Sequence, residues 1–260
     1  MRAPKSRKSV RQDSILAALE GNPTLRVVQI AEQLDVSTET VRRDLNELEA
    51  SGRLSRTYGG AVKNSNRFEP ALNERLSLKV LERRAIAAEA VSRYASEEAL
   101  LLGGGATMVL FARMLSEVPR RITVITAAYP VAVELAANPM IEIIMLPGAF
   151  EPQEHVTVGP DTLRAMDRYK VRTAIIGASG LNTEGVSEAM LRAGEVYGAM
   201  VEKSEHLVVL ADSGKFDKRA LVLLTDWNAT TTLITDSAPS GELKTAIDRG
   251  GTQVIVTPQN

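Results

Sequence analysis

The feature that most constrains this chain's fold is a series of short apolar runs that alternate with helical patterns after residue 79. The runs are rich in Ile, Val and Leu, and they lie within "ALLLGGGATMVLFARML", "ITVITAAYPVAVELAAN", "IEIIMLPG", "RTAIIGASG", "GEVYGAMVEKSEHLVVLADSG", "TTLITD" and "TQVIVT". Continuous apolar strands separated by helices are typical of a parallel sheet that is buried on both faces. Residues 79–260 are therefore predicted to form an α/β domain with a mostly parallel, Rossmann-like sheet.

Residues 1–64 follow a different pattern, that of three short helices and a hairpin. The apolar positions of the three helices are Ile15, Leu16 and Leu19, then Val27, Ile30, Ala31 and Leu34, then Val41, Leu45 and Leu48. Gly21 is expected to end the first helix, and "DVS" separates the second from the third. The run "SGRLSRTYGGAV" then combines a helix end with short β-prone segments around Gly59 and Gly60. We expect a small winged helix-turn-helix domain, and residues 65–78, which contain Pro70, are predicted to be a linker.

Charge separates the same two regions. Residues 1–67 hold twelve Lys and Arg against eight Asp and Glu, a balance of +4, which leaves 19 against 24, or −5, for the remainder. A small basic module ahead of a larger acidic one is the arrangement expected when only the first approaches a polyanion. A solvated basic tail is the alternative interpretation of the charge alone.

The third helix places two adjacent arginines on its outer face. Ser37 is positioned to accept a backbone hydrogen bond as N-cap. At about 100° per residue, Arg42 and Arg43 then point away from the side of Val41. A helix that presents polar side chains from its first turns after a tight turn has the geometry that enters the DNA major groove. The alternative is that the two arginines solvate the helix by pairing with the nearby Glu39 and Glu47.

Several glycine-rich turns follow strands in the larger region. Gly103, Gly104 and Gly105 join a strand to a helix and expose amides that suit an anion, or else form a tight turn against close packing. Their spacing is neither a dinucleotide fingerprint nor a Walker A loop. Asp212 and Lys215 follow another strand in "VLADSGKF", where Lys215 suits a phosphate or carboxylate and Asp212 suits a helix cap. Ligands bind at the carboxyl ends of such strands, so a small polar ligand is expected there.

Other chemistry is made improbable by composition. The chain has no cysteine, and its two histidines, His155 and His206, stand far apart, so no metal site is expected. The N-terminus lacks the apolar core of a signal peptide, and no apolar run reaches the length of a membrane span. We expect a cytoplasmic protein with no cofactor and no membrane contact.

The run "VSTETVRRDLNELEASGRLSRTYGGAV" resembles the N-terminal signature of the DeoR family of bacterial transcriptional regulators. The matching features are the T-hydrophobe-R-R-D-L core and the G-x-L-x-R-x-x-G-G wing. The resemblance implies that operator DNA is contacted by Ser37, Thr38, Thr40, Arg42 and Arg43, with Arg56, Gly59 and Gly60 in the wing. Arginines then supply phosphate contacts or guanine readout, and hydroxyls position the helix end.

The resemblance extends over the larger domain, which in this family is a sensor similar to sugar-phosphate isomerases. Matching features are Gly159 and Pro160, "IIGASG", Glu195 and "DSGKF". Elsewhere the chain departs from the family pattern, because GGGAT replaces D-S-G-T-T, Thr126, Ala127 and Ala128 replace T-N-S, Pro147 and Gly148 replace a glycine pair, and Arg172 replaces an aspartate. The effector-binding residues expected are Gly103, Gly104, Gly105, Ala106, Thr107, Thr126, Gly177, Glu195, Asp212 and Lys215. The alanines predict a less polar pocket wall than is usual in the family.

Two functions are compatible with these residues. In the first, the chain represses a carbohydrate-catabolism operon and leaves its operator when a sugar phosphate or related sugar-derived effector binds. Its sensor domain would then carry self-association into a homodimer or homotetramer. In the second, the chain is a sugar-phosphate isomerase-like enzyme with Glu195 as base and Lys215 as phosphate ligand. An enzyme has no use for a winged helix, so we expect the regulator.

Overall fold

The computed structural model divides the chain into two compact units, Met1–Phe68 and Glu69–Asn260. It describes Lys8, Val10–Gln12, Ser14, Ile15, Ala18 and residues 27–50, 54–57, 60–63 and 70–258. Side chains are described for these residues except 49, 50, 54–57 and 60–63. Of the expected first helix, Leu16, Leu19 and Gly21 lie outside the described residues.

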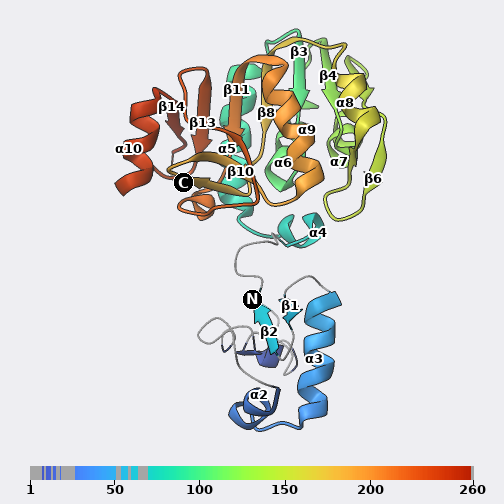
Figure 1. Cartoon of the computed structure of the whole chain (residues 1–260). Coiled ribbons are helices and arrows are strands. Elements are labelled where there is room, and N and C mark those ends of the chain that lie inside the picture. Colours follow the sequence, from blue (N-terminus) through green and yellow to red (C-terminus); the bar gives the residue numbers. More distant parts are fainter. Residues whose placement is uncertain are drawn as a thin grey trace. The chain divides into compact units, whose positions relative to one another are not determined.

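The first unit is a helix-turn-helix followed by a hairpin (Figure 1). Its elements are α2 (Val27–Gln33), α3 (Thr38–Ala50), β1 (Leu54–Thr57) and β2 (Gly60–Lys63). Its core is made by Ile15, Ile30, Ala31, Val41, Leu45 and Leu48. β1 and β2 pair antiparallel from Leu54 opposite Lys63 to Thr57 opposite Gly60. The expected winged helix-turn-helix is confirmed.

The second unit is built on a seven-stranded sheet with the order β14-β13-β11-β8-β3-β4-β5, in which every pairing is parallel. The strands are β3 (Ala99–Leu102), β4 (Ile122–Thr126), β5 (Ile141–Met145), β8 (Val171–Ile176), β11 (Ser204–Leu210), β13 (Thr231–Thr235) and β14 (Gln253–Val256). The smaller pieces are the hairpin β6 (Ala149–Glu151) and β7 (Val156–Val158), and the antiparallel sheet of β9 (Gly180–Asn182), β10 (Gly185–Glu188) and β12 (Val222–Thr225). The predicted α/β class with a mostly parallel sheet is confirmed.

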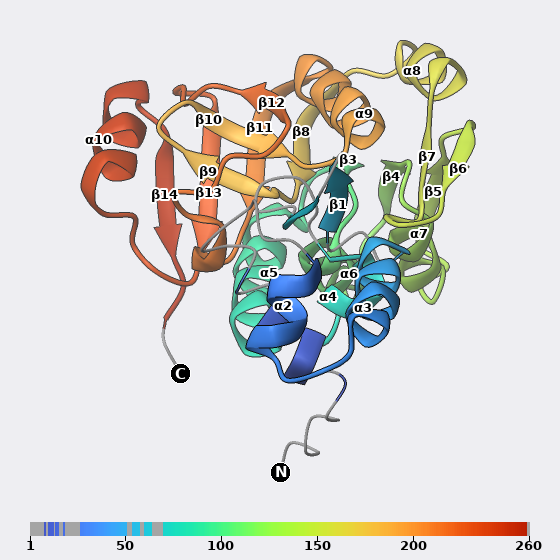
Figure 2. The ribbon, with the colours of Figure 1, turned by 60° about the horizontal axis from the view of Figure 1, so that its bottom comes forward.

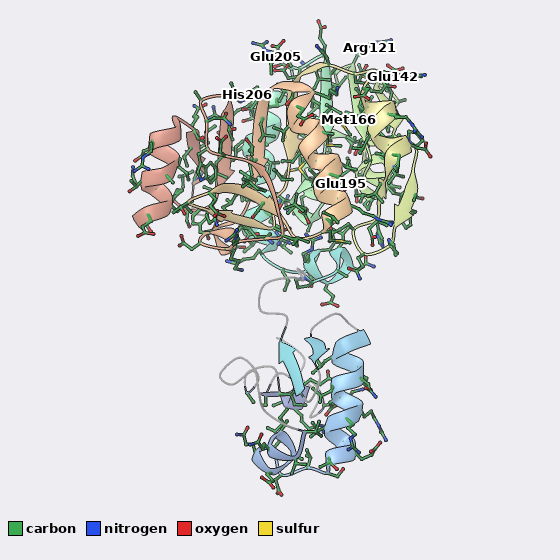
Figure 3. All side chains as sticks on the ribbon, viewed as in Figure 1. Arg121, Glu142, Met166, Glu195, Glu205 and His206 are labelled. Carbon is green, nitrogen blue, oxygen red and sulfur yellow. The ribbon has the colours of Figure 1, made fainter. Side chains whose placement is uncertain are left out.

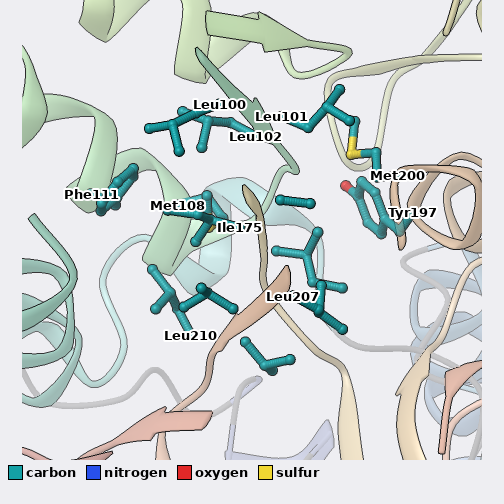
Figure 4. Packing of buried hydrophobic residues seen from close by; sticks show 14 of the residues in the cluster. Leu100, Leu101, Leu102, Met108, Phe111, Ile175, Tyr197, Met200, Leu207 and Leu210 are labelled. Atoms are coloured by element: carbon teal, nitrogen blue, oxygen red, sulfur yellow. The ribbon is translucent and has the colours of Figure 1, made fainter. Parts of the chain in front are cut away.

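Helices cover both faces of this sheet. They are α5 (Val80–Tyr94), α6 (Ala106–Leu115), α7 (Tyr129–Leu135), α8 (Pro160–Met166), α9 (Leu191–Glu202) and α10 (Gly241–Gly250), with a 3-10 turn at Ser213–Lys215. Figure 2 shows α5, α6 and α7 on one side of the strands and α8 and α9 on the other. The core follows the same division, with Met108 and Phe111 of α6 at one face and Tyr197 and Met200 of α9 at the opposite face (Figure 4).

The expected linker contains a further element, the short helix α4 (Leu72–Arg75). Leu72 and Arg75 are buried in the second unit, and the backbone N–H of Leu72 donates to the carbonyl of Gln153 at 3.1 Å. Residues 70–78 thus belong structurally to the second unit, which the polar, proline-containing sequence did not indicate. No helix in the described part of the chain is both long enough and apolar enough to cross a membrane.

The strand order reverses between β3 and β8. From β3 the chain proceeds to β4 and β5 on one side, and it later returns to place β8, β11, β13 and β14 on the other. The loops that leave the carboxyl ends of β3 and β8 consequently diverge, and a crevice opens between them. Ligands of open α/β sheets bind at this topological switch point.

Candidate functional site

The exposed face of α3 is positioned by its first turn and by an ion pair between the buried Asp44 and the partly exposed Arg11. The backbone N–H of Thr40 donates to Ser37 Oγ at 3.1 Å, and the hydroxyls of Ser37 and Thr40 are 2.8 Å apart, so the predicted N-cap is confirmed. Asp35 in the preceding turn has a φ of 50°, a left-handed conformation that Asp tolerates. The Asp44 carboxylate is buried and accepts from Arg11 Nε at 2.5 Å. This pair fixes α3 against the first helical segment.

Arg42 and Arg43 lie on the exposed face of α3. Arg42 Nη1 is 3.7 Å from the Glu39 carboxylate, a loose contact between side chains that are 62% and 77% exposed. Glu47, the other expected pairing partner, instead accepts from Lys8 at 2.6 Å and from Gln12 at 2.9 Å. Because exposed pairs contribute little, the two guanidinium groups are available to an external anion.

The wing residues are described less fully. The backbones of Arg56 and Gly60 pair with the opposite strand of the hairpin. Gly59 and the side chain of Arg56 lie outside the described residues. Their expected contacts with phosphate stay predictions.

A cavity lies at the switch point, and seven of the ten residues expected to bind effector line it. These are Gly104, Gly105, Ala106, Thr107, Gly177, Asp212 and Lys215. They come from the carboxyl ends of β3, β8 and β11, which are neighbours in the sheet. The sequence indicated three glycine-rich or polar strand ends, and the strand order brings them together.

The remaining three expected residues do not line the cavity. Gly103 continues β3 by donating its N–H to the carbonyl of Ile175 at 2.9 Å. Thr126 is buried and donates its hydroxyl to the carbonyl of Leu102 at 2.7 Å, so it joins β4 to β3. Glu195 is exposed on α9, while Tyr197, two residues later on the helix, turns inward (Figures 3 and 4). The two-residue step rotates the side chain to the other face of the helix.

The N-terminus of α6 points its amides at this cavity. Gly105 is the N-cap residue, with a φ of 105° that favours glycine, and no side chain caps the helix. The backbone N–H of Gly104 donates to Tyr197 Oη at 3.2 Å. A Cβ on Gly104 would come within 2.7 Å of that hydroxyl, so the close approach requires glycine. The first amides of a helix lack intrahelical partners and favour an anion.

Five charged or hydroxyl side chains that sequence reasoning missed also line the cavity: Arg75, Arg83, Glu154, Glu188 and Tyr197. Arg75 of α4 is paired with Glu154, which lies between β6 and β7. Arg83 Nε donates to Asp212 at 3.1 Å, and Arg83 Nη1 donates to the carbonyl of Arg75 at 2.6 Å. Arg83 shares a face of α5 with Ile86, Ala87 and Ala90, and a charge at a core position was the available signal. Arg75 and Glu154 gave no such signal.

Burial shifts several pKa values in the cavity. It raises the pKa of Glu188, whose oxygens accept from the Ser179 hydroxyl at 2.9 Å and from the Met190 N–H at 3.0 Å. It also raises the pKa of Glu154, against the opposing effect of Arg75. Burial lowers the pKa of Lys215 to about 8, helped by nearby Lys218. Asp212 also caps the 3-10 turn by accepting from the Gly214 N–H at 3.1 Å, so its expected capping role is confirmed.

A second hollow, whose lining includes Glu97, Glu98, Lys170 and Arg172, lies at the opposite end of the sheet, where the strands begin. Arg121, Glu142, Glu205 and His206 lie there, at the amino ends of the strands (Figure 3). His206 contacts the Thr232 hydroxyl at 3.0 Å and stacks on Tyr94, and burial lowers its pKa. His206 is therefore a packed side chain remote from the cavity.

A winged helix-turn-helix joined to an α/β unit with a charged cavity at its switch point defines a class of protein, the DNA-binding transcriptional regulators with a sensor domain. Comparison with known families places the chain within that class. The DeoR-like helix-turn-helix domain matches residues 11–67, and the DeoR C terminal sensor domain matches residues 78–237. The chain belongs to the DeoR family and is a transcriptional regulator, not an enzyme.

Relatives that match most of the chain are also named as transcriptional regulators. The HTH-type transcriptional repressor GlcR of Bacillus subtilis is 29% identical over 248 residues, covering 95% of each chain. The lactose phosphotransferase system repressor of Lactococcus lactis is 28% identical over 233 residues, covering 88% of this chain and 91% of that one. The L-fucose operon activator of Haemophilus influenzae is 27% identical over 228 residues, covering 87% and 91%.

Among solved structures, ribose 5 phosphate isomerase A from Neisseria gonorrhoeae is similar over 53% of this chain and 53% of its own. The TM-score is 0.38 and the identity 19%. A likeness of that size supports no argument about function.

Proposed function

We propose that this regulator represses a carbohydrate-catabolism operon and leaves its operator when a small anionic sugar derivative binds the cavity. Residues 1–64 would contact the DNA, and residues 79–260 would bind the effector and carry self-association, in the cytoplasm. Two relatives are named as repressors, one of them of a lactose phosphotransferase system, and a third is named as a fucose operon activator. These names support sugar operons as the targets, and we propose that this chain represses its operon.

The DNA-binding part of the proposal rests on α3. Its N-terminal residues Ser37, Thr38 and Thr40 precede the exposed Arg42 and Arg43, and a recognition helix contacts base edges from its N-terminal turns. Hydroxyls at the helix start suit phosphate oxygens, and guanidinium groups suit phosphate or guanine. The β1–β2 hairpin would add Arg56 and glycine amides as phosphate contacts.

One observation carries the effector part, the convergence of the uncapped α6 N-terminus with cationic side chains at the switch point. Lys215, Arg83 and Arg75 all line the same cavity as Gly104 and Gly105. Backbone amides at a helix start together with guanidinium and ammonium groups form an anion site. The buried carboxylates of Glu154 and Glu188 would accept hydrogen bonds from sugar hydroxyls.

The cavity is too small to hold a sugar derivative as it stands. Its free volume is about 20 Å³, enough for about one water molecule, whereas pockets for small molecules measure roughly 300 Å³ or more. An effector must therefore displace side chains that fill the site. Such a ligand binds one arrangement of the unit better than the other, which is the requirement for shifting the equilibrium between a DNA-binding and a non-binding form.

Self-association is supported by exposed apolar side chains at the β5 edge of the sheet. Tyr129 and Val133 of α7, Met145 of β5 and Phe150 of β6 are all exposed. Regulators usually bring two or more DNA-binding units to one operator, so a homodimer or homotetramer is proposed. Light scattering on the full chain should give at least a dimer, and a strict monomer at operator-binding concentrations would contradict this part.

The proposal is tested by titrating sugars into the protein–operator complex. Fluorescence anisotropy on the upstream intergenic DNA would follow release by phosphorylated and unphosphorylated sugars, and thermal shift would report binding to the folded chain. Lys215→Met should reduce release by phosphorylated sugars, while Lys218→Met, an exposed lysine of the same loop, should not. Equal responses of both variants would place the effector elsewhere. Absence of specific binding to the intergenic DNA would refute the operator assignment.

A further inference from the structure

Arg75 is the side chain through which the segment after the DNA-binding unit reaches the cavity. It is the last residue of α4, it is buried, and its guanidinium pairs with the Glu154 carboxylate. Its carbonyl accepts from Arg83 Nη1 at 2.6 Å, and Arg83 in turn holds Asp212 at the end of β11. α4 is thereby tied both to the β6–β7 turn and to the effector site proposed above.

The guanidinium also faces the glycine loop. A Cβ built on Gly105 would lie 3.9 Å from Arg75 Nη1, and that distance brings the guanidinium beside the α6 N-terminus. An anion bound to the first amides of α6 would therefore lie within reach of Arg75. Glu154 holds the same guanidinium through its other terminal nitrogen, Nη2.

A phosphate group and a carboxylate offer the guanidinium the same paired oxygen acceptors. The free volume of the cavity is about 20 Å³, enough for about one water molecule, so the side chains that line it, Arg75 and Glu154 among them, must move before an added anion can enter. We propose that Arg75 is an effector-binding residue that pairs with Glu154 while no effector is bound. The anionic group of the effector then replaces Glu154 as the partner of Arg75. This inference rests on the proposed effector site and adds the residue that couples it to the rest of the chain.

Exchange of partners changes the attachment of α4. Glu154 precedes β7, and Gln153, one residue before it, accepts the Leu72 N–H at 3.1 Å, so both ties between α4 and the β6–β7 turn lie side by side. When the anion takes Arg75, α4 loses its ionic tie to this turn. In the chain, α4 begins nine residues after β2 ends at Lys63. A shift of α4 therefore acts on the segment that leads directly to the hairpin of the DNA-binding unit.

A purely structural ion pair predicts the opposite response to mutation. If Glu154 only positions Arg75, then Glu154→Gln misplaces the guanidinium and weakens anion binding. If Glu154 competes with the anion, then Glu154→Gln removes the competitor and strengthens anion binding. The sign of the change in affinity thus separates the two roles.

The experiment measures binding of inorganic phosphate to the full chain by calorimetry. Glu154→Gln should bind phosphate on the order of tenfold more tightly than the parent, and Arg75→Gln should bind it about tenfold more weakly. Arg75→Gln combined with Glu154→Gln should lose the gain, because the competitor acts only through Arg75. Glu142→Gln, which removes a carboxylate at the opposite edge of the sheet, is the matched control and should match the parent (Figure 3).

Movement of α4 is followed with a single fluorophore. The chain has no cysteine, so Asn73→Cys labels α4 alone at an exposed position. Phosphate should change the emission of this label in the parent, and Glu154→Gln should change it before phosphate is added. Glu154→Asp, which keeps the charge on a shorter side chain, serves if Glu154→Gln does not fold, and it should also tighten phosphate binding.

Two outcomes would overturn the inference. One is phosphate binding by Glu154→Gln that is equal to or weaker than that of the parent, and the other is an Asn73→Cys label that does not respond. If Lys215→Met abolishes phosphate binding in either case, the assignment of the effector site is supported. Only the proposed replacement of Glu154 by the anion is then wrong. If no variant binds phosphate, the exchange and the anionic effector fail together, while operator binding, measured separately, continues to test the DNA-binding role.

Discussion

The two units of this regulator place their charges differently. The small unit holds Arg42 and Arg43 on the exposed face of α3, whereas the large unit buries Arg75, Arg83 and Glu154 within its cavity. Exposed charges act on a partner at a distance and are screened by salt. Buried charges act on their immediate neighbours and respond to pH through shifted pKa values. We therefore expect DNA binding by the first unit to weaken with salt, and anion binding by the second unit to depend on pH.

Asp44 is a buried charge in the small unit, whose Arg42 and Arg43 are exposed. Its replacement should have the largest effect on stability. Asp44→Asn replaces the buried carboxylate with a neutral amide and weakens the charge-assisted bonds from Arg11, which is 26% exposed, so it should cost about 1.5–3 kcal/mol. Among the described residues of this unit six apolar side chains form the buried core, so the reserve against that loss is small. Hydrogen exchange of the α3 amides should accelerate strongly and operator binding should fall, with the second unit unaffected.

The control for Asp44 is Asp161→Asn. Asp161 pairs with Arg164 on the surface, where both side chains are more than 70% exposed, so the change should stay within about 0.5 kcal/mol. Unchanged exchange in the Asp44 variant would show that the small unit does not depend on this buried charge.

The second effect concerns the exposed arginines. Arg42→Ala or Arg43→Ala should each cost about 1–3 kcal/mol of operator affinity if the side chain reads a base. A residue that contacts only phosphate should instead weaken binding to all sequences and lower the salt slope by about one. Anisotropy titrations at several salt concentrations would separate the two cases.

Arg84→Ala is the matched control, since Arg84 is an exposed arginine of the large unit and its replacement changes net charge equally. It should leave operator affinity unchanged. If the double variant of Arg42 and Arg43 bound the operator as the parent does, the recognition face of α3 would be wrongly assigned.

The third effect is a pH dependence confined to the large unit. Lys215 loses its charge as pH rises through about 8, so affinity for inorganic phosphate should fall about tenfold between pH 7 and 9. Lys215→Met should bind weakly and lose this dependence. Operator binding by the small unit at fixed salt should not show the same midpoint.

The same lysine affects stability with a defined sign. Its folded pKa lies below the ordinary value of 10.5, so the unfolded chain holds more protons between pH 8 and 10.5. Stability of the parent relative to Lys215→Met should therefore rise with pH across that window. A flat difference between the two chemical denaturation profiles would contradict the shifted pKa.

The smallest effect is expected at the α3 N-cap. Ser37→Ala removes the hydroxyl that accepts the Thr40 N–H and should cost about 1 kcal/mol. Ser92→Ala on α5 also removes a helix hydroxyl bonded to backbone, yet it caps nothing and should cost less. If both variants have the same stability, the N-cap does not contribute as proposed.

Local patterns were sufficient for the seven strands of the parallel sheet and for the outward face of α3. The spacing of Val41, Leu45 and Leu48 sets which side of the helix is buried, and the capping chemistry of Ser37 lies within three residues of its partner. Apolar runs of β3, β8 and β11 likewise predict buried parallel strands, because each run carries its own signal. The glycines after β3 indicate an anion loop for the same reason.

Only the tertiary structure decided how those pieces meet. Strand order brought the ends of β3, β8 and β11 together, and a helix that the linker pattern concealed brought Arg75 to Glu154, 79 residues away in the chain. Arg83 and Asp212 are separated by 129 residues. The sequence by itself determined the class of protein, through the resemblance of residues 36–62 to the DeoR signature, and the exposed face of α3, through periodicity over a few turns. The buried pairs that fill the cavity follow from long-range packing, since each charge is tolerated only through a partner that the fold supplies.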